Sequence, residues 1–204
     1  MKGAILIISG PSGSGKSTLV RTISSELKNV YFSISTTTRA IREDEIEGVN
    51  YHFTDEKTFK QDVEDGLFLE WAQVHGNYYG TSLKPIIKAI KDGKLVIFDI
   101  DVQGHKIAKQ KLENVITSVF ITTPTLSSLK QRLRDRATDK EDVIQRRLSN
   151  ALYEMTSINE YDFLIINDDF KKASSELLSI AKVAKLKSSL FDIETLISNW
   201  DDEN

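Results

Sequence analysis

The chain of 204 residues has no cysteine, only three prolines and only ten glycines. Without cysteine there is no disulfide framework, no cysteine-ligated zinc or iron–sulfur site and no thiol nucleophile. Few prolines and glycines, together with 40% hydrophobic residues, exclude a low-complexity or disordered chain. The chemistry of the protein must therefore use phosphate, carboxylate, amide and guanidinium groups.

The sequence also lacks long hydrophobic runs and an excess of charge of one sign. Its first apolar run, 4–8, is far shorter than a signal-peptide core, and no run approaches the roughly 20 apolar residues of a membrane span. The 27 basic and 30 acidic side chains give a net charge of −3, which argues against a surface for nucleic acid. We expect a cytoplasmic protein that contacts neither membrane nor nucleic acid.

Apolar runs rich in β-branched residues alternate with segments of helical periodicity. This alternation predicts an α/β fold, a parallel sheet covered by helices on both faces. The predicted strands are Ala4–Ser9, Lys94–Asp101, Val115–Thr122 and Asp162–Asn167. The predicted helices cover about 16–28, 81–92, 103–111, 125–136, 140–159, 171–187 and 193–200.

Residues 33–84 differ from the rest of the chain. Short alternating pieces at 31–35, 50–54 and 67–74 are separated by turn signals such as Asp65-Gly66. We predict a small mixed β lobe inserted into a single domain that spans 1–204.

The segment 187–204 is predicted to be a C-terminal extension. Its apolar side chains, together with Leu186, indicate packing on the core or on a second subunit, and the sequence leaves monomer and homodimer both open. These side chains are Leu186, Leu190, Ile193, Leu196, Ile197 and Trp200.

A phosphate-binding signature follows the first predicted strand. Residues 10–17 match the pattern G-x-x-x-x-G-K-[ST] in full and open a helix. In such a P-loop, backbone N–H groups converge on phosphate oxygens, Lys16 reaches the β- and γ-phosphates, and the Ser17 hydroxyl can ligate Mg²⁺. A serine-capped glycine turn is the alternative. We assign ATP binding to Gly10, Pro11, Ser12, Gly13, Ser14, Gly15, Lys16, Ser17 and Thr18.

Further motifs follow the P-loop. They include Leu-Glu-Trp-Ala at 69–72, Gly-Asn-Tyr-Tyr-Gly-Thr at 76–81, Phe-Asp-Ile-Asp-Val-Gln-Gly at 98–104 and Arg-Leu-Arg-Asp-Arg at 132–136, together with the segment 35–53. In this order, and over nearly the whole chain, they resemble guanylate kinase, a P-loop nucleoside monophosphate kinase. The resemblance implies an ATP:GMP phosphotransferase that uses Mg²⁺ and makes GDP from GMP (and dGDP from dGMP) in purine nucleotide metabolism and GMP recycling.

The resemblance places the acceptor nucleotide in the inserted lobe. A monophosphate needs guanidinium and phenol donors, and we expect Glu45 to hold Arg39 or Arg42 in place. Guanine presents N1–H and N2 amino donors side by side, which the Glu70 carboxylate can accept; adenine would leave that carboxylate unpaired. An ion pair with a lysine is the alternative for Glu70. The GMP-binding set is Ser35, Arg39, Arg42, Glu45, Tyr51, Glu70, Tyr79, Thr81 and Asp101.

Two carboxylates, Asp99 and Asp101, end the predicted strand 94–101. Alternation places both on one face, at the sheet edge where ligands of such folds bind. One can hold Mg²⁺ through water and the other can contact the guanine, although both could instead cap the next helix. We assign Ser17 and Asp99 to the metal and Asp101 to GMP.

The segment 130–147 has seven basic and four acidic side chains and lies in a predicted lid region, 125–150. In the guanylate kinase pattern three of its arginines match a mobile lid that clamps the phosphates. Guanidinium groups and Mg²⁺ can stabilise the charge on the equatorial oxygens during phosphoryl transfer. The catalytic set is Lys16, Arg132, Arg136 and Arg147, and Asn167, which matches a family segment near the adenine, joins the ATP-binding set.

Two alternative functions fit parts of this pattern. A non-enzymatic guanylate-kinase-like module would hold a phosphopeptide in the same pocket, but such modules have a degraded P-loop and lid, whereas Lys16, Ser17, Arg132 and Arg136 are present here. A kinase for another nucleoside monophosphate would differ mainly in the base pocket. We predict an enzyme whose partners are the small molecules ATP and GMP.

Overall fold

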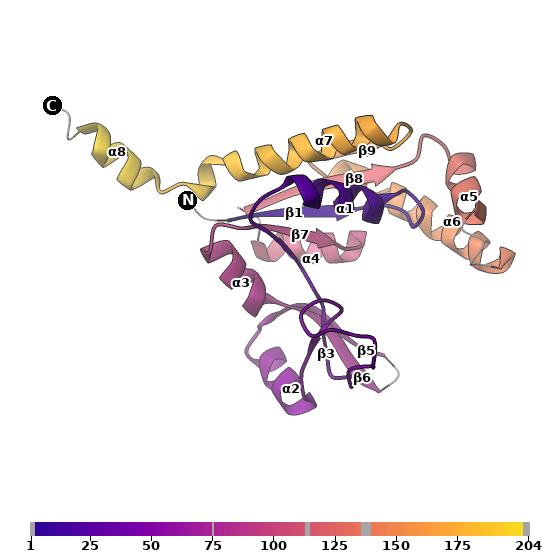
Figure 1. Ribbon diagram of the computed structural model, residues 1–204, viewed down its shortest axis with the longest axis horizontal. Coiled ribbons are helices and arrows are strands. Elements are labelled where there is room, and N and C mark those ends of the chain that lie inside the picture. The colour runs from indigo at the N-terminus through magenta and orange to yellow at the C-terminus, as the bar shows by residue number, and fades with distance from the viewer. Residues whose placement is uncertain (1–2, 75, 113–114, 136–139, 202–204) are drawn as a thin grey trace.

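The computed structural model describes residues 3–74, 76–112, 115–135 and 140–201, and it contains two separate sheets (Figure 1). The larger sheet has five parallel strands in the order β2-β7-β1-β8-β9. The predicted α/β fold is confirmed. The strands are β1 (Ala4–Ser9), β2 (Val30–Phe32), β7 (Leu95–Asp99), β8 (Ile116–Thr122) and β9 (Phe163–Ile166).

Strand β1 lies at the centre of the core, and all of its residues are buried. Successive side chains alternate between the two faces. Leu6 and Ile8 pack with α1 (Lys16–Glu26) and α7 (Phe170–Val183), whereas Ile5 and Ile7 pack with α3 (Leu83–Lys91) and α4 (Val102–Leu112). The helices therefore cover both faces of the sheet and fix the end of β1, from which the P-loop starts.

The smaller sheet is mixed, with the order β4-β3-β6-β5. Its strands are β3 (Thr36–Thr37), β4 (His52–Phe53), β5 (Phe68–Val74) and β6 (Asn77–Ser82), and β3 pairs parallel with β4 but antiparallel with β6. Figure 1 shows this sheet set apart from the larger one.

Two local expectations for the inserted lobe are wrong. The alternating piece 31–35 is expected in the small sheet, but its first two residues belong to β2, which pairs with β7 at the edge of the larger sheet. A helix that the strand-like pattern did not predict, α2 (Glu56–Glu64), begins after Asp55, whose side chain accepts a hydrogen bond from the Thr58 backbone N–H. Phe59 of α2 is buried and stacks on Phe68 at 4.3 Å, which fixes the helix on the sheet.

The lid region contains α5 (Leu126–Asp135) and α6 (Glu141–Met155), which is followed by a short 3₁₀ helix, η2 (Ile158–Glu160). The two α-helices pack through one apolar cluster: Leu129, Leu133, Ile144, Leu148 and Ala151. Arg136, one of the predicted catalytic residues, lies outside the described residues.

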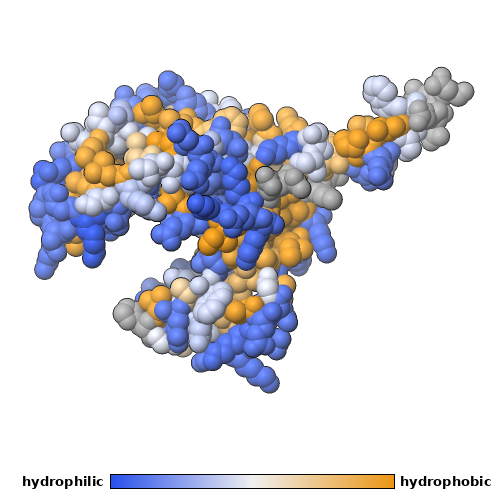
Figure 2. All heavy atoms as spheres, turned by 180° about the vertical axis from the view of Figure 1, so that it is seen from behind, coloured by the Kyte–Doolittle hydropathy of each residue, from blue (hydrophilic) through white to orange (hydrophobic). Residues whose placement is uncertain are grey.

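The C-terminal segment consists of η3 (Ala184–Leu186), η4 (Ser188–Leu190) and α8 (Ile193–Asp201). Leu190 is buried in the core, but α8 projects away from the body, and its apolar side chains, such as Trp200, are exposed (Figures 1 and 2). The expected packing of this helix on its own core is therefore wrong, and packing on a second subunit stays a prediction. Among the described residues no helix is long and apolar enough to cross a membrane.

Candidate active site

The P-loop joins β1 to α1 and needs glycine at two positions of close approach. Gly10 has φ 138°, and a Cβ atom there would lie 2.0 Å from the Ile121 carbonyl oxygen. Gly15 has φ 96°, and its Cβ would lie 2.4 Å from the Asn167 side-chain nitrogen. Residues other than glycine are excluded at both positions, because the positive φ disfavours a Cβ atom and a Cβ atom would also collide with its neighbours.

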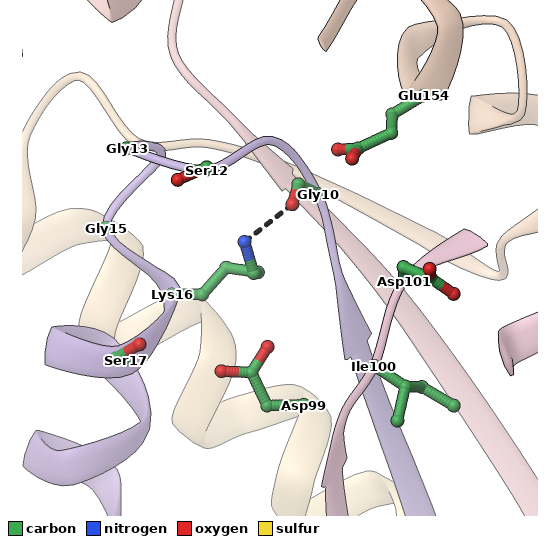
Figure 3. Close-up of a pocket in the computed structure, with 10 residues that line it drawn as sticks. All are labelled: Gly10, Ser12, Gly13, Gly15, Lys16, Ser17, Asp99, Ile100, Asp101 and Glu154. Carbon is green, nitrogen blue, oxygen red and sulfur yellow. Dashed lines mark hydrogen bonds between the residues drawn. The ribbon is translucent and has the colours of Figure 1, made fainter. Parts of the chain in front are cut away.

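The loop surrounds a cavity of about 310 Å³ (Figure 3). Lys16 lies in it and donates hydrogen bonds to the carbonyl oxygens of Gly10, at 2.5 Å, and Pro11, at 3.1 Å. Asp99 at the end of β7 faces the lysine; desolvation in the cavity raises the pKa of Asp99, and the Lys16 ammonium opposes this shift. The lining residues are Gly10, Ser12, Gly13, Gly15, Lys16, Ser17, Asp99, Ile100, Asp101 and Glu154.

Two arginines of the lid region contact the P-loop. From α5, Arg132 donates to the Asn167 carbonyl oxygen at 2.7 Å and to the Ser14 carbonyl oxygen at 3.4 Å. From α6, Arg147 donates to the Ser12 hydroxyl at 2.6 Å. The fold thus brings two of the predicted catalytic arginines to the loop that contains Lys16.

Asn167 contacts the P-loop through its side-chain amide. Its side chain is buried and donates to the Ser14 carbonyl oxygen at 2.8 Å. Together with the approach of Gly15, this contact assigns Asn167 a structural task that the sequence pattern did not indicate. Its predicted contact with the adenine stays a prediction.

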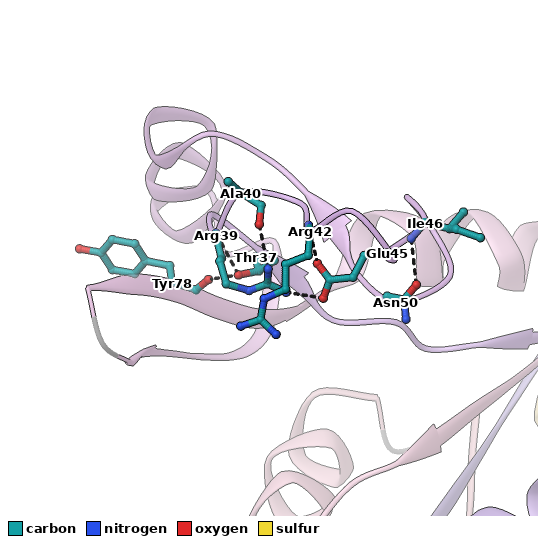
Figure 4. Close-up of polar contacts among 8 residues, drawn as sticks. All are labelled: Thr37, Arg39, Ala40, Arg42, Glu45, Ile46, Asn50 and Tyr78. Carbon is teal, nitrogen blue, oxygen red and sulfur yellow. Dashed lines mark hydrogen bonds and ion pairs between the residues drawn. The ribbon is translucent and has the colours of Figure 1, made fainter.

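In the inserted lobe, Glu45 organises two arginines (Figure 4). One of its carboxylate oxygens pairs with the Arg39 guanidinium at 2.6 Å, and the other accepts from the Arg42 backbone N–H at 2.9 Å. These bonds lower the pKa of Glu45, the Arg39 bond most of all. Arg39 also lies over the Tyr51 ring at 5.5 Å, and Tyr51 meets Tyr79 edge to face at 6.0 Å. Five of the predicted GMP-binding residues are therefore neighbours.

A second pair lies on the antiparallel strands β5 and β6. The buried Thr81 hydroxyl donates to a carboxylate oxygen of Glu70 at 2.6 Å. This partner differs from the lysine that was the alternative for Glu70, and it leaves the second carboxylate oxygen for another donor.

The remaining predicted GMP-binding residues lie elsewhere. Ser35 is exposed where the chain enters the inserted lobe, and its carbonyl oxygen accepts from the His52 backbone N–H at 2.9 Å. Asp101 lies two residues beyond the end of strand β7, lines the P-loop cavity and accepts a hydrogen bond from the Gly104 backbone N–H at 2.8 Å. Asp101 thus caps α4, which was one of the alternatives for it.

Comparison with known proteins gives consistent results. The family model described as guanylate kinase matches residues 2–183. Relatives named guanylate kinase from Sulfurimonas denitrificans and Wolinella succinogenes are 54% and 53% identical; each alignment covers 98% of this chain and, respectively, 97% and 93% of the relative. The chain belongs to the guanylate kinase family.

The solved structures agree with this assignment. The crystal structure of guanylate kinase from Anaplasma phagocytophilum is similar with a TM-score of 0.66 and 28% identity, over 92% of this chain and 89% of that one. A Thermus thermophilus protein with a TM-score of 0.51 and 16% identity shares the fold alone. The predicted guanylate kinase family is confirmed, and the findings favour a nucleoside monophosphate kinase over a phosphopeptide-binding module.

The residues predicted to hold Mg²⁺ in this guanylate kinase fold suit that ion. The Ser17 hydroxyl and the Asp99 carboxylate line the same cavity, and both are hard oxygen ligands. Among the described residues no three histidine or acidic groups form a metal cluster.

Sequence reasoning missed Glu154, which lines the P-loop cavity from α6. The signal that could have found it is helical spacing, because Glu154 follows the predicted lid residue Arg147 by two turns on the same face.

Proposed function

We propose that this protein transfers the γ-phosphoryl group of ATP to GMP or dGMP. The observation that carries the proposal is the presence, in one chain, of a complete P-loop cavity and of a separate arginine–tyrosine cluster with a carboxylate beside it. The first suits a triphosphate donor and the second suits a guanine monophosphate acceptor.

On the donor side, the P-loop N–H groups bind the triphosphate and Lys16 exchanges its carbonyl partners, Gly10 and Pro11, for phosphate oxygens. Arg132 and Arg147 already lie at the loop and turn toward the transferred group, together with Arg136. Mg²⁺ bound with ATP, near Ser17 and Asp99, supplies charge neutralisation. A loose transition state needs these cations more than it needs a strong base.

On the acceptor side, the cluster around Arg39 binds the monophosphate, and Glu45 keeps the guanidinium in place. Glu70 accepts hydrogen bonds from guanine N1–H and the N2 amino group, and Thr81 fixes the orientation of the carboxylate. Arg42, Tyr51 and Tyr79 complete the phosphate contacts, and Ser35 and Asp101 the base contacts.

The two sides belong to different sheets, so the lobe and the lid must close over the substrates. Closure excludes water, which would otherwise compete with GMP for the phosphoryl group. The product GDP would serve purine nucleotide metabolism, including GMP recycling, in the cytoplasm.

A coupled ADP-release assay tests the proposal. Purified protein is given Mg²⁺, ATP and one acceptor at a time: GMP, dGMP, AMP, CMP, UMP or dTMP. We expect turnover with GMP and dGMP and at least about a hundredfold lower kcat/KM for the others. Equal or faster turnover with another acceptor would assign the chain to a different nucleoside monophosphate, and no turnover with any of them would refute the kinase reaction.

A further inference from the structure

Helix α6 carries a carboxylate that the mechanism above does not use. Arg147, Ala151 and Glu154 share one face of this helix. The face lies along the P-loop, because Arg147 contacts Ser12 and Ala151 lines a small pocket with Pro11. Glu154 follows on the same face and reaches the P-loop cavity itself (Figure 3).

Glu154 has a buried oxygen that nothing in the described part of the chain satisfies. Its Oε2 atom has no hydrogen-bond partner there. Burial raises the pKa of Glu154, Lys16 opposes the shift and Asp101 adds to it. A desolvated carboxylate is costly unless a donor or a cation faces it. A cation bound in the cavity would supply such a partner.

The charges of the cavity lining indicate which partner fits. Three acidic residues and one lysine line the cavity: Asp99, Asp101, Glu154 and Lys16. Figure 3 shows Asp99 and Glu154 on opposite sides of the lysine. A metal-free triphosphate is a polyanion, and it would meet more negative than positive groups on this wall. A triphosphate complexed with a divalent cation presents positive charge and bound water to the same carboxylates.

We propose that Glu154 makes the cavity select Mg²⁺-complexed nucleotide over metal-free nucleotide. Arg132 and Arg147 contact the P-loop at Ser14 and Ser12 but do not line the cavity, so that, within the described part of the lid region, Glu154 is the charged side chain that does. Glu154 is a specificity residue and not a direct metal ligand, which agrees with the absence of a three-group cluster among the described residues. The inference rests on the proposed function for the identity of the donor nucleotide.

The test is a binding measurement without turnover. Calorimetry gives the Kd of a non-hydrolysable ATP analogue, without GMP, in Mg²⁺ and in chelator at equal ionic strength. The ratio of the two Kd values is the readout. We expect the wild-type protein to bind more tightly with Mg²⁺, and Glu154→Gln to reduce this preference about tenfold, mainly by tightening metal-free binding. A damaged fold would weaken binding in both conditions instead.

Matched variants separate the local charge from other effects. Glu154→Asp keeps the charge and should stay closer to the wild-type ratio than Glu154→Gln. Glu176→Gln removes a partly exposed carboxylate of α7 and should leave the ratio unchanged. An unchanged ratio in Glu154→Gln, an equal loss in Glu176→Gln, or no Mg²⁺ preference in the wild type would overturn the proposal.

Glu154→Met replaces Glu154→Gln if that variant does not fold. If both neutral variants unfold while Glu154→Asp folds, the carboxylate is a folding requirement and the proposal is refuted. The acceptor assay with wild-type protein tests the kinase proposal, and the Kd ratio tests this inference. The two measurements are independent, so failure of one proposal can be distinguished from failure of the other.

Discussion

The proposed donor and acceptor sites of this protein differ in how they would bind phosphate. On the proposed donor side one continuous segment, 10–17, would supply the phosphate contacts through its backbone and Lys16, and it lies between a fully buried strand and a helix. On the proposed acceptor side, two side-chain pairs would form the site: Arg39–Glu45 in the loop after β3, and Thr81–Glu70 between strands β6 and β5. The P-loop is thus built from one short stretch of chain, whereas the proposed base recognition depends on the pairing of two strands.

The largest expected effect separates the two sides. Lys16→Ala removes the cation of the donor cavity and should lower kcat by at least about a thousandfold, because phosphoryl transfer depends on positioned charge. The acceptor lobe does not contain Lys16, so the GMP Kd from calorimetry should stay within about twofold. Lys172→Ala, on the surface of α7, is the control. Wild-type turnover by Lys16→Ala would show that the donor cavity is not where chemistry occurs.

Base recognition is the next test. Glu70→Gln keeps the shape but presents an amide donor to guanine donors, and should raise the GMP KM by about a hundredfold while the ATP KM changes by less than about twofold. Steady-state kinetics with each substrate varied in turn gives both values. Glu64→Gln, an exposed residue of α2, should change neither. Equal changes in the two KM values would remove Glu70 from guanine recognition.

Within the inserted lobe, a residue proposed to contact the GMP phosphate, Arg39, can be compared with the residue that positions it, Glu45. Arg39→Ala should raise the GMP KM by about tenfold or more, because it removes a phosphate contact. Glu45→Gln should raise it less, by about threefold, because the guanidinium remains but loses its charged partner. The same kinetics measure both. A larger effect from Glu45→Gln than from Arg39→Ala would reverse the two roles.

The smallest expected effect concerns the pH dependence of the free energy of unfolding, through a buried histidine of α4. His105 of α4 is fully buried and stacks on Tyr161 at 4.0 Å, and burial lowers the pKa of His105, helped by Lys109 and opposed by Glu160 and Asp162. Because the native state then binds fewer protons than the unfolded chain, this stabilisation is complete above pH 6.5, the ordinary value, and is lost as the pH falls toward the native pKa. The expected slope is up to about 1.4 kcal/mol per pH unit.

Urea unfolding of the wild type and of His105→Phe between pH 7.5 and 5 measures this slope. The variant keeps an aromatic ring against Tyr161 but cannot titrate, so its free energy of unfolding should fall less with acid than that of the wild type. Parallel curves for the two proteins would exclude His105 as the titrating group.

The larger sheet could be predicted from sequence because its strands are continuous apolar runs. Strand β1 has the predicted bounds, and the predicted β7 and β8 shrink only at their ends. The inserted lobe could not be predicted in the same detail. Its strands β3 and β4 have two residues each, and α2 contains few apolar residues, so that pairing between distant segments decides their structure.

By itself, the sequence determined the α/β fold, the family and the P-loop, because the spacing of neighbouring residues encodes a contiguous turn and a strand–helix unit. Only the tertiary structure decided that Thr81 holds Glu70, that Asn167 supports Gly15 and Ser14, and that Glu154 faces the P-loop cavity. The contacts of Asn167 and Glu154 join residues far apart in the chain, and the Thr81–Glu70 contact joins two paired strands. Their geometry follows from how helices and strands pack, which no local spacing specifies.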